Sequence, residues 1–189
     1  MLKYLPNALT IIRFIFIPVI IFYIFTGNYI LAFIFFTISA ITDVADGFIA
    51  RKYNFVSNFG KLMDPLADKL TQISTLASLA LAHIIPIWIL IIVLSKEFIM
   101  IIGASFLYGK DVVVYSKWYG KLSTVLLYFA IVASLLIKQF DLPEFYSTLG
   151  FWLYCLALTA TIFSLIMYIK DLYNKGFIDK QDLNRGRSS

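Results

Sequence analysis

The sequence predicts an all-α integral membrane protein built from six transmembrane helices. Of its 189 residues, 61% are apolar or aromatic and 14% are charged, and the mean hydropathy is +0.86. A typical soluble domain has about 25% charged residues. This composition excludes a soluble globular protein, and it excludes an intrinsically disordered one because disordered chains are poor in apolar residues.

Six apolar stretches approach the roughly 20 residues that a helix needs to cross a bilayer. They are expected at residues 8–26, 29–50, 60–82, 85–107, 117–137 and 146–170. Polar or turn-forming residues separate them at 26–28, 51–58, 83–86, 108–116 and 138–144. The sequence therefore predicts one transmembrane domain over residues 1–170, followed by a short, poorly ordered tail over residues 171–189.

Basic residues are distributed unequally between the two sides that six spans define. One side carries both termini and the loops after the second and fourth spans. It holds Lys3, Arg51, Lys52, Lys110, Lys117 and the basic residues between Lys170 and Arg187, whereas the other side holds Lys138. Because cytoplasmic segments are enriched in Lys and Arg, we expect both termini to face the cytoplasm. A nucleic-acid partner is not expected, since no basic stripe with stacking aromatic residues lies outside the spans.

Four aspartates lie inside the predicted spans. Asp43 and Asp46 belong to the second span, and Asp64 and Asp68 to the third. Each costs about 2.5–3.5 kcal/mol near the centre of a membrane helix, which a structural role rarely justifies. Spacings of three and four residues put each pair on one helix face. The short loop between the two spans makes an antiparallel hairpin, so we expect both pairs at the same depth in the cytoplasmic half, facing each other.

Four converging carboxylates need positive counter-charge. Mg²⁺ or Mn²⁺ can supply it, because hard cations take oxygen ligands and keep positions open for phosphate. Two such ions would balance four aspartates and clamp the attacking and leaving oxygens of a phosphoryl-type displacement. Arg51, Lys61 and Lys69 flank this hairpin and could hold phosphate, although each alone is more simply a topology anchor. A second class of function stays open, namely a transporter for which the divalent cation or proton is cargo.

The spacing of these residues resembles the signature of the CDP-alcohol phosphatidyltransferase family. Residues Asp43 to Asp68 read DxxDGxxAR, then eight residues, then GxxxDxxxD, and every fixed position of that pattern is filled. The chain length, the six spans and the place of the motif across the second and third spans also fit. The resemblance implies the CDP-alcohol phosphotransferase-like fold, as a homodimer in a bacterial plasma membrane with a polar cavity open to the cytoplasm.

The resemblance also implies roles for the residues of the motif. The reaction would move the phosphatidyl group of CDP-diacylglycerol to an alcohol and release CMP. Asp68 would be the general base on the acceptor hydroxyl. The two divalent cations, Mg²⁺ or Mn²⁺, would be bound by Asp43, Asp46, Asp64 and Asp68. The cytidine nucleotide would contact Asp43, Asp46, Gly47, Ala50, Arg51 and Gly60.

The acceptor alcohol is expected to be sn-glycerol 3-phosphate. The opening residues from Leu5 to Arg13 resemble the branch of the family that makes phosphatidylglycerophosphate, and a cardiolipin-forming branch has a similar opening. Candidate ligands of the acceptor or its phosphate are Thr10, Arg13, Lys61, Lys96 and Lys121. Arg13 is alternatively a snorkelling anchor, and Lys96 alternatively forms an ion pair with Glu97.

One position departs from that branch. Ala104 stands where its members commonly carry a second Arg, and the cardiolipin-forming enzymes also lack this Arg. Transfer to phosphatidylglycerol therefore remains the alternative reaction.

Overall fold

A computed structural model describes the backbone of residues 5–52, 58–107 and 118–185, and side chains within residues 10–43, 63–102 and 118–170. These ranges fold into helices joined by short turns, which confirms the predicted all-α class for the described residues. The helices in the described ranges are α1 (Leu5–Phe25), α2 (Tyr29–Lys52), α3 (Asn58–Leu81), α4 (Ile87–Leu107), α5 (Trp118–Gln139) and α6 (Glu144–Arg185). Except for the end of α6, their bounds lie within three residues of the predicted spans.

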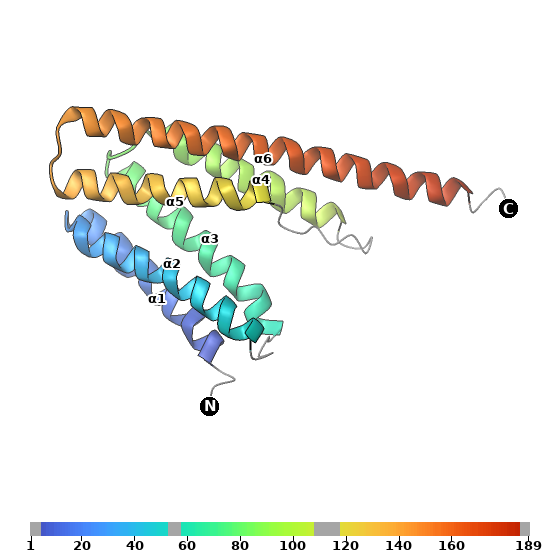
Figure 1. Ribbon diagram of the computed structural model, residues 1–189, viewed down its shortest axis with the longest axis horizontal. Coiled ribbons are helices and arrows are strands. Elements are labelled where there is room, and N and C mark those ends of the chain that lie inside the picture. Colours follow the sequence, from blue (N-terminus) through green and yellow to red (C-terminus); the bar gives the residue numbers. More distant parts are fainter. Residues whose placement is uncertain (1–4, 53–57, 108–117, 186–189) are drawn as a thin grey trace.

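Successive helices run in opposite directions (Figure 1). The turns that join α1 to α2, α3 to α4 and α5 to α6 gather at one end of the molecule, which we call the turn end. Toward the other end, α1, α2 and α3 diverge from α4, α5 and α6 (Figure 1). The start of α1, the end of α2 and the start of α3 lie together there. The parts of α2 and α3 that carry the signature are therefore at the end opposite the turns.

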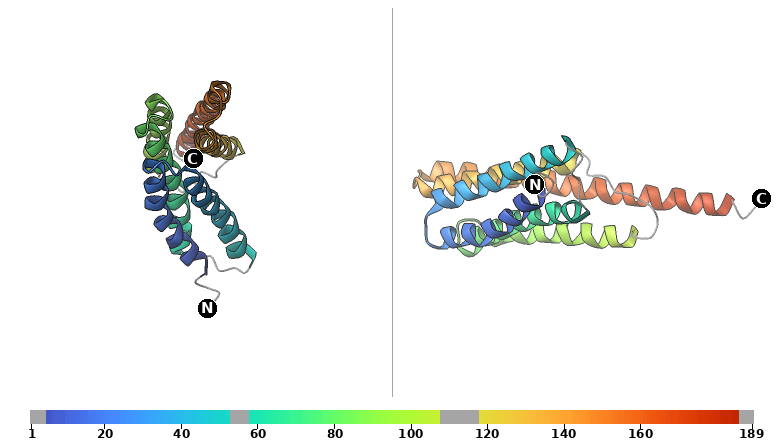
Figure 2. Two further views of the ribbon diagram at one scale, coloured as in Figure 1. Left: turned by 90° about the vertical axis from the view of Figure 1, so that its left-hand side faces the viewer. Right: turned by 90° about the horizontal axis from the view of Figure 1, so that it is seen from below.

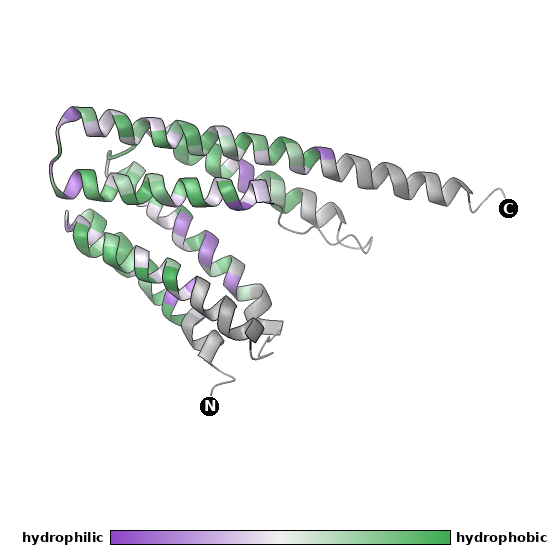
Figure 3. Cartoon of the chain, in the orientation of Figure 1, coloured by the Kyte–Doolittle hydropathy of each residue, from purple (hydrophilic) through white to green (hydrophobic). Residues whose placement is uncertain are grey.

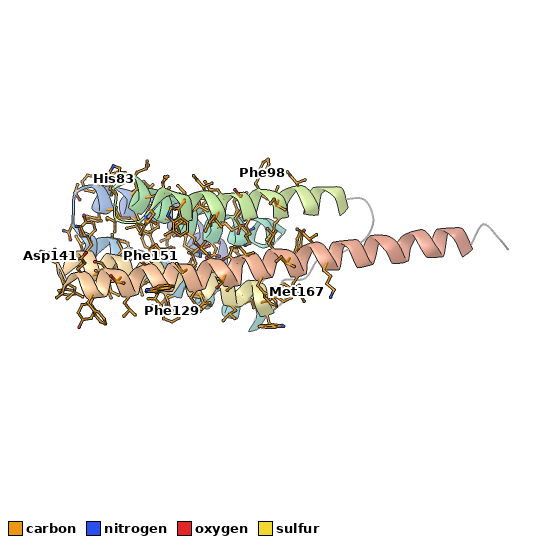
Figure 4. The ribbon with its side chains drawn as sticks, turned by 90° about the horizontal axis from the view of Figure 1, so that it is seen from above. His83, Phe98, Phe129, Asp141, Phe151 and Met167 are labelled. Atoms are coloured by element: carbon orange, nitrogen blue, oxygen red, sulfur yellow. The ribbon has the colours of Figure 1, made fainter. Side chains whose placement is uncertain are left out.

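The three turns at the turn end each contain a residue with positive φ and a hydrogen bond from the next N–H to a carbonyl five residues earlier. After α1, the N–H of Gly27 bonds the carbonyl of Ile24 and the N–H of Asn28 bonds that of Tyr23, with φ of Gly27 at +77°. This is a Schellman cap, in which a residue in the left-handed region ends the helix. His83 (φ 57°) and Asp141 (φ 45°) occupy the corresponding positions after α3 and α5. Both residues are labelled in Figure 4.

Apolar side chains both fill the interior and cover the outside. α1 packs along α2 and α3, while α5 packs along α6 and also meets α2. The buried core includes Ile20, Ile24, Phe36, Leu76, Leu79, Leu127, Ile131, Leu135 and Tyr154. Phe98 and Phe129 project outward from opposite sides of the molecule (Figure 4), and both are more than 60% exposed. A surface of this kind suits lipid better than water.

Among the described residues, two helical stretches are long and apolar enough to cross a membrane by length and composition, namely Trp118–Gln139 and Glu144–Lys170. Thr10–Phe25 and Tyr29–Asp43 form shorter apolar helices within the same ranges. In Figure 2, α1 lies beside α2 and α5 lies beside α6.

Helix α3 buries polar side chains. Thr71, Thr75 and Ser78 are each at most 3% exposed. Their hydroxyls donate to backbone carbonyls four residues earlier at 2.7–2.9 Å, which satisfies them inside the helix. Polar residues accordingly mark α3 in the hydropathy view, whereas α5 and the first part of α6 are predominantly apolar (Figure 3).

The end of α6 corrects the expectation for the tail. Residues 171–185 continue the helix, where the sequence predicts a poorly ordered segment. At 1.5 Å per residue, the 42 residues of α6 extend about 63 Å, roughly twice the hydrocarbon core of a bilayer. Figure 1 shows the last part of α6 projecting beyond the other helices.

Candidate active site between α1, α2, α3 and α5

Arg13 of α1 lies between the two helices that carry the signature. Its Nη1 donates to Oδ1 of Asp43 on α2 at 2.5 Å, and its Nη2 lies 3.6 Å from Oδ1 of Asp64 on α3. The Arg13 side chain is 1% exposed. A snorkelling anchor would keep its head group in contact with water, so this alternative is wrong. Arg13 is instead a buried cation that supplies counter-charge to two aspartates.

Thr10 holds the second of these aspartates. It lies almost one turn before Arg13 on α1, is fully buried, and donates from Oγ1 to Oδ1 of Asp64 at 2.5 Å. Spacing three residues apart puts Thr10 and Arg13 on one face of the helix. The opening segment of the chain is therefore part of the site, and its contacts are with carboxylates. Whether Thr10 or Arg13 also contacts an acceptor phosphate stays a prediction.

Asp68 is held from a different direction. The hydroxyl of Tyr128 on α5 donates to Oδ1 of Asp68 at 2.6 Å. The ring of Tyr128 stacks on Phe36 of α2, with centroids 4.9 Å apart. The sequence reasoning missed Tyr128. It is one of twelve tyrosines in an aromatic-rich chain, and its place on an apolar helix gives no signal of a polar partner.

The three described aspartates of the signature lie close enough to interact. Arg13 bridges Asp43 and Asp64, and the Tyr128 that holds Asp68 stacks on Phe36 of the helix that carries Asp43. The two helices thus approach each other at Asp43 and Asp64, which share Arg13. The expected site, formed by the hairpin of α2 and α3, is incomplete, however. Groups on α1 and α5 donate the hydrogen bonds that hold these carboxylates.

Other predicted site residues lie outside the described side chains. Their backbone is helical, and their roles remain predictions. On α2 they are Asp46, Gly47, Ala50 and Arg51, and on α3 they are Gly60 and Lys61.

The chemistry of the described aspartates suits a hard divalent cation. A carboxylate has about four acceptor positions, so a single hydrogen bond at Oδ1 leaves capacity for a metal ion. Within the side chains described, no three such groups already surround one point.

A second charged cluster joins α3 to α4. Glu97 on α4 pairs with Lys69 on α3 and with its neighbour Lys96, each at 2.5 Å. Glu97 and Lys96 are 12% exposed, whereas Lys69 is 41% exposed. The alternative of a Lys96–Glu97 ion pair is therefore confirmed, and Lys69 is an addition to it. Lys121 is exposed near the start of α5.

Comparison with known proteins identifies the family. The sequence profile of the CDP-alcohol phosphatidyltransferases matches residues 3–166, which include the whole signature and α1 to α5. This chain belongs to the CDP-alcohol phosphatidyltransferase family. Members of the family are membrane proteins and typically use divalent cations, in agreement with the apolar helices and the aspartate cluster.

Three relatives carry the name CDP-diacylglycerol–glycerol-3-phosphate 3-phosphatidyltransferase. The protein from Mycoplasma genitalium is 34% identical over 148 residues, which cover 74% of this chain and 63% of the relative. That from Bacillus subtilis is 39% identical over 121 residues, covering 63% of each chain. That from Aquifex aeolicus is 30% identical over 139 residues, covering 72% of this chain and 78% of the relative. The chain thus spans somewhat less than two thirds of the first two relatives.

Proposed function

We propose that this protein transfers the phosphatidyl group of CDP-diacylglycerol to sn-glycerol 3-phosphate, giving phosphatidylglycerophosphate and CMP. The family membership and the names of the three relatives support this reaction. The observation that carries it is the contact of Thr10 and Arg13 with Asp64 and Asp43. The opening segment that resembles the phosphatidylglycerophosphate branch is thereby joined directly to the signature aspartates.

Divalent cations bound by Asp43, Asp46, Asp64 and Asp68 would neutralise the pyrophosphate of the donor and stabilise the departing CMP. The side chains of the protein carry out proton transfer and stabilise the leaving group. Asp68 accepts the proton of the acceptor hydroxyl as its oxygen attacks the phosphatidyl phosphorus. The bond between that phosphorus and the oxygen of CMP breaks, and CMP leaves with the electron pair. Arg51 of the signature would meet the charge of the leaving nucleotide.

The acceptor carries a phosphate of its own, which a cationic group must hold. Lys69 and Lys96 are suited to this because Glu97 brings both ammonium groups to one place between α3 and α4. Lys61 and Lys121 are the further candidates for binding this phosphate.

The proposal includes a place in the cell. The start of α1 and the end of α6 would lie on the cytoplasmic side of a bacterial plasma membrane, with the turn end facing outward. The basic residues of the sequence favour this orientation. The active site would then open to the cytoplasm, where water-soluble sn-glycerol 3-phosphate can reach it. The protein would act as a homodimer, in keeping with its family resemblance.

The test offers each acceptor separately to membranes that contain the overproduced protein. With CDP-diacylglycerol and radiolabelled sn-glycerol 3-phosphate, the label is expected to become lipid-soluble as equimolar CMP appears. Membranes from cells with an empty vector provide the control. Cardiolipin formed from phosphatidylglycerol, with no incorporation of glycerol phosphate, would contradict the assigned acceptor and support the alternative. Uptake of a divalent cation without CMP release under any condition would instead favour a transporter.

A further inference from the structure

Tyr128 contacts an aspartate of the signature from a helix that lies outside the signature. Its hydroxyl donates to Oδ1 of Asp68 at 2.6 Å across 60 residues of sequence. Its ring is partly buried and stacks on that of Phe36, with an interplanar angle of 25°. Phe36 is itself completely buried in the core. Packing rather than the hydrogen bond alone therefore fixes the position of the hydroxyl.

We propose that Tyr128 is a positioning residue, which orients Asp68 by holding one of its two carboxylate oxygens and leaves the other oxygen free to act. Oδ1 is held by the hydroxyl of Tyr128, and Oδ2 serves the metal ion and the reacting hydroxyl. This inference rests on the proposed function, in which Asp68 both binds metal and accepts a proton.

The need for such a residue follows from the freedom of an aspartate side chain. The terminal torsion of Asp is broad, with two nearly equivalent orientations, so a carboxylate on one helix does not fix its own oxygens. A general base or metal ligand acts well only when its geometry is held within a fraction of an ångström. One hydrogen bond from a donor fixed by stacking selects a single orientation.

The choice of donor differs among the three described aspartates. Asp43 and Asp64 share the positive charge of Arg13, and Asp64 also accepts from the hydroxyl of Thr10. Asp68 accepts from the neutral phenol of Tyr128. A neutral donor orients a carboxylate without offering it a competing cation, which suits the aspartate that must bind a metal ion and accept a proton.

A purely structural contact is the competing explanation, because the same hydrogen bond also ties α3 to α5. The variant Tyr128→Phe separates the two explanations, since it keeps the aromatic ring that stacks on Phe36 and removes only the hydroxyl. Tyr154→Phe is the matched control. Tyr154 is a buried tyrosine of α6 whose hydroxyl accepts from Oγ of Ser134 on α5 at 3.1 Å, and no signature aspartate contacts it in the described structure.

The experiment measures Mn²⁺ binding to the full chain in lipid nanodiscs by the electron paramagnetic resonance signal of free Mn²⁺. Removing a residue that orients a metal ligand typically costs on the order of 10–100-fold in affinity or activity. Tyr128→Phe is expected to weaken Mn²⁺ binding to that extent and to lower kcat, with little change in KM for the acceptor. Tyr154→Phe is expected to match the wild type in both measurements.

A double variant shows whether Tyr128 acts through Asp68. In an Asp68→Asn background, adding Tyr128→Phe is expected to cause no further loss of Mn²⁺ binding. Wild-type binding and kcat in Tyr128→Phe would overturn the inference, as would an equal further loss in the Asp68→Asn background. If the wild type releases no CMP with any acceptor but the Mn²⁺ results hold, the proposed function fails and the positioning role stands.

Discussion

The guanidinium of Arg13 lowers the electrostatic cost of placing two aspartates close together inside an apolar protein. Asp43 and Asp64 come from different helices, and Arg13 contacts the first and approaches the second from a third helix. A cation in this place offsets repulsion between the carboxylates that would otherwise oppose the packing of α2 near α3. Divalent cations would act in the same sense, so Arg13 and a metal ion are partly interchangeable as sources of positive charge.

Arg13→Gln is expected to lower the thermal stability of the purified protein in the presence of a chelator. Breaking a buried ion pair costs about 3–5 kcal/mol, and the lower figure applies here because Asp43 is 38% exposed. Excess Mg²⁺ should recover more stability in this variant than in the wild type, since the ion replaces the missing charge. Melting temperatures with EDTA and with Mg²⁺ measure both effects, and Arg13→Lys provides a control that keeps the charge. Equal stability of Arg13→Gln and wild type in EDTA would contradict the interpretation.

Asp68→Asn is expected to abolish transfer while the protein still inserts and folds. An amide cannot accept the proton of the acceptor hydroxyl, and loss of a general base costs about 10²–10⁴-fold in rate. CMP release from CDP-diacylglycerol measures the effect, and the yield of monodisperse protein measures folding. Asp141→Asn serves as the matched control, because Asp141 is exposed at the turn end and Asn also tolerates a positive φ. Robust transfer by Asp68→Asn would rule out Asp68 as the base.

The helices themselves follow closely from the sequence, because each apolar run is bounded by residues that end helices. Gly27 in its left-handed conformation and the Pro86 that precedes α4 are examples. The end of α6 could not be located in this way. Residues 171–185 alternate charges, and this pattern suits an exposed helix as well as a disordered tail.

Position 83 tests the cap that ends α3. His83→Gly is expected to keep or raise the melting temperature, because glycine adopts a positive φ without steric cost. His83→Val should lower stability by about 1–2 kcal/mol, since a β-branched residue is strained in the left-handed region. Thermal unfolding of both variants in the same detergent is the measurement. The inverse order, with the valine variant more stable, would contradict the cap.

At the scale of the whole molecule, the sequence predicted that the aspartates of α2 and α3 form the site. It did not predict that α1 and α5 supply the groups that contact them. The spacing of the aspartates placed them on helix faces, and Asp43 and Asp64 do approach each other through Arg13. The contributions of Thr10, Arg13 and Tyr128 depend on how α1 and α5 pack against that hairpin. Such packing between distant segments leaves no periodic trace in the sequence, so the partners of the aspartates could not be assigned from spacing.

The orientation of the molecule in the membrane is open to a direct test. Lys138→Cys places a thiol at the turn end and Arg185→Cys places one at the end of α6, both in a Cys155→Ser background. Lys138→Cys is expected to react with a membrane-impermeant maleimide in intact cells, because the proposed orientation puts the turn end outside. Arg185→Cys should react only after the cells are permeabilised, and the Cys155→Ser parent should stay unlabelled. Labelling of Arg185→Cys in intact cells would reverse the orientation.

The polar interior of α3 bears on how the protein is made. Asp64, Asp68 and Gln72 recur every four residues on this helix, and Thr71, Thr75 and Ser78 are buried beside them. As a lone segment leaving the insertion machinery, such a helix would meet lipid with its carboxylates uncovered, at about 2.5–3.5 kcal/mol for each near the bilayer centre. α1 and α2 are synthesised before α3 and already carry Thr10, Arg13 and Asp43. We therefore expect α1 and α2 to remain next to the translocon until α3 is inserted. α3 would then pack against protein instead of lipid as it enters the bilayer.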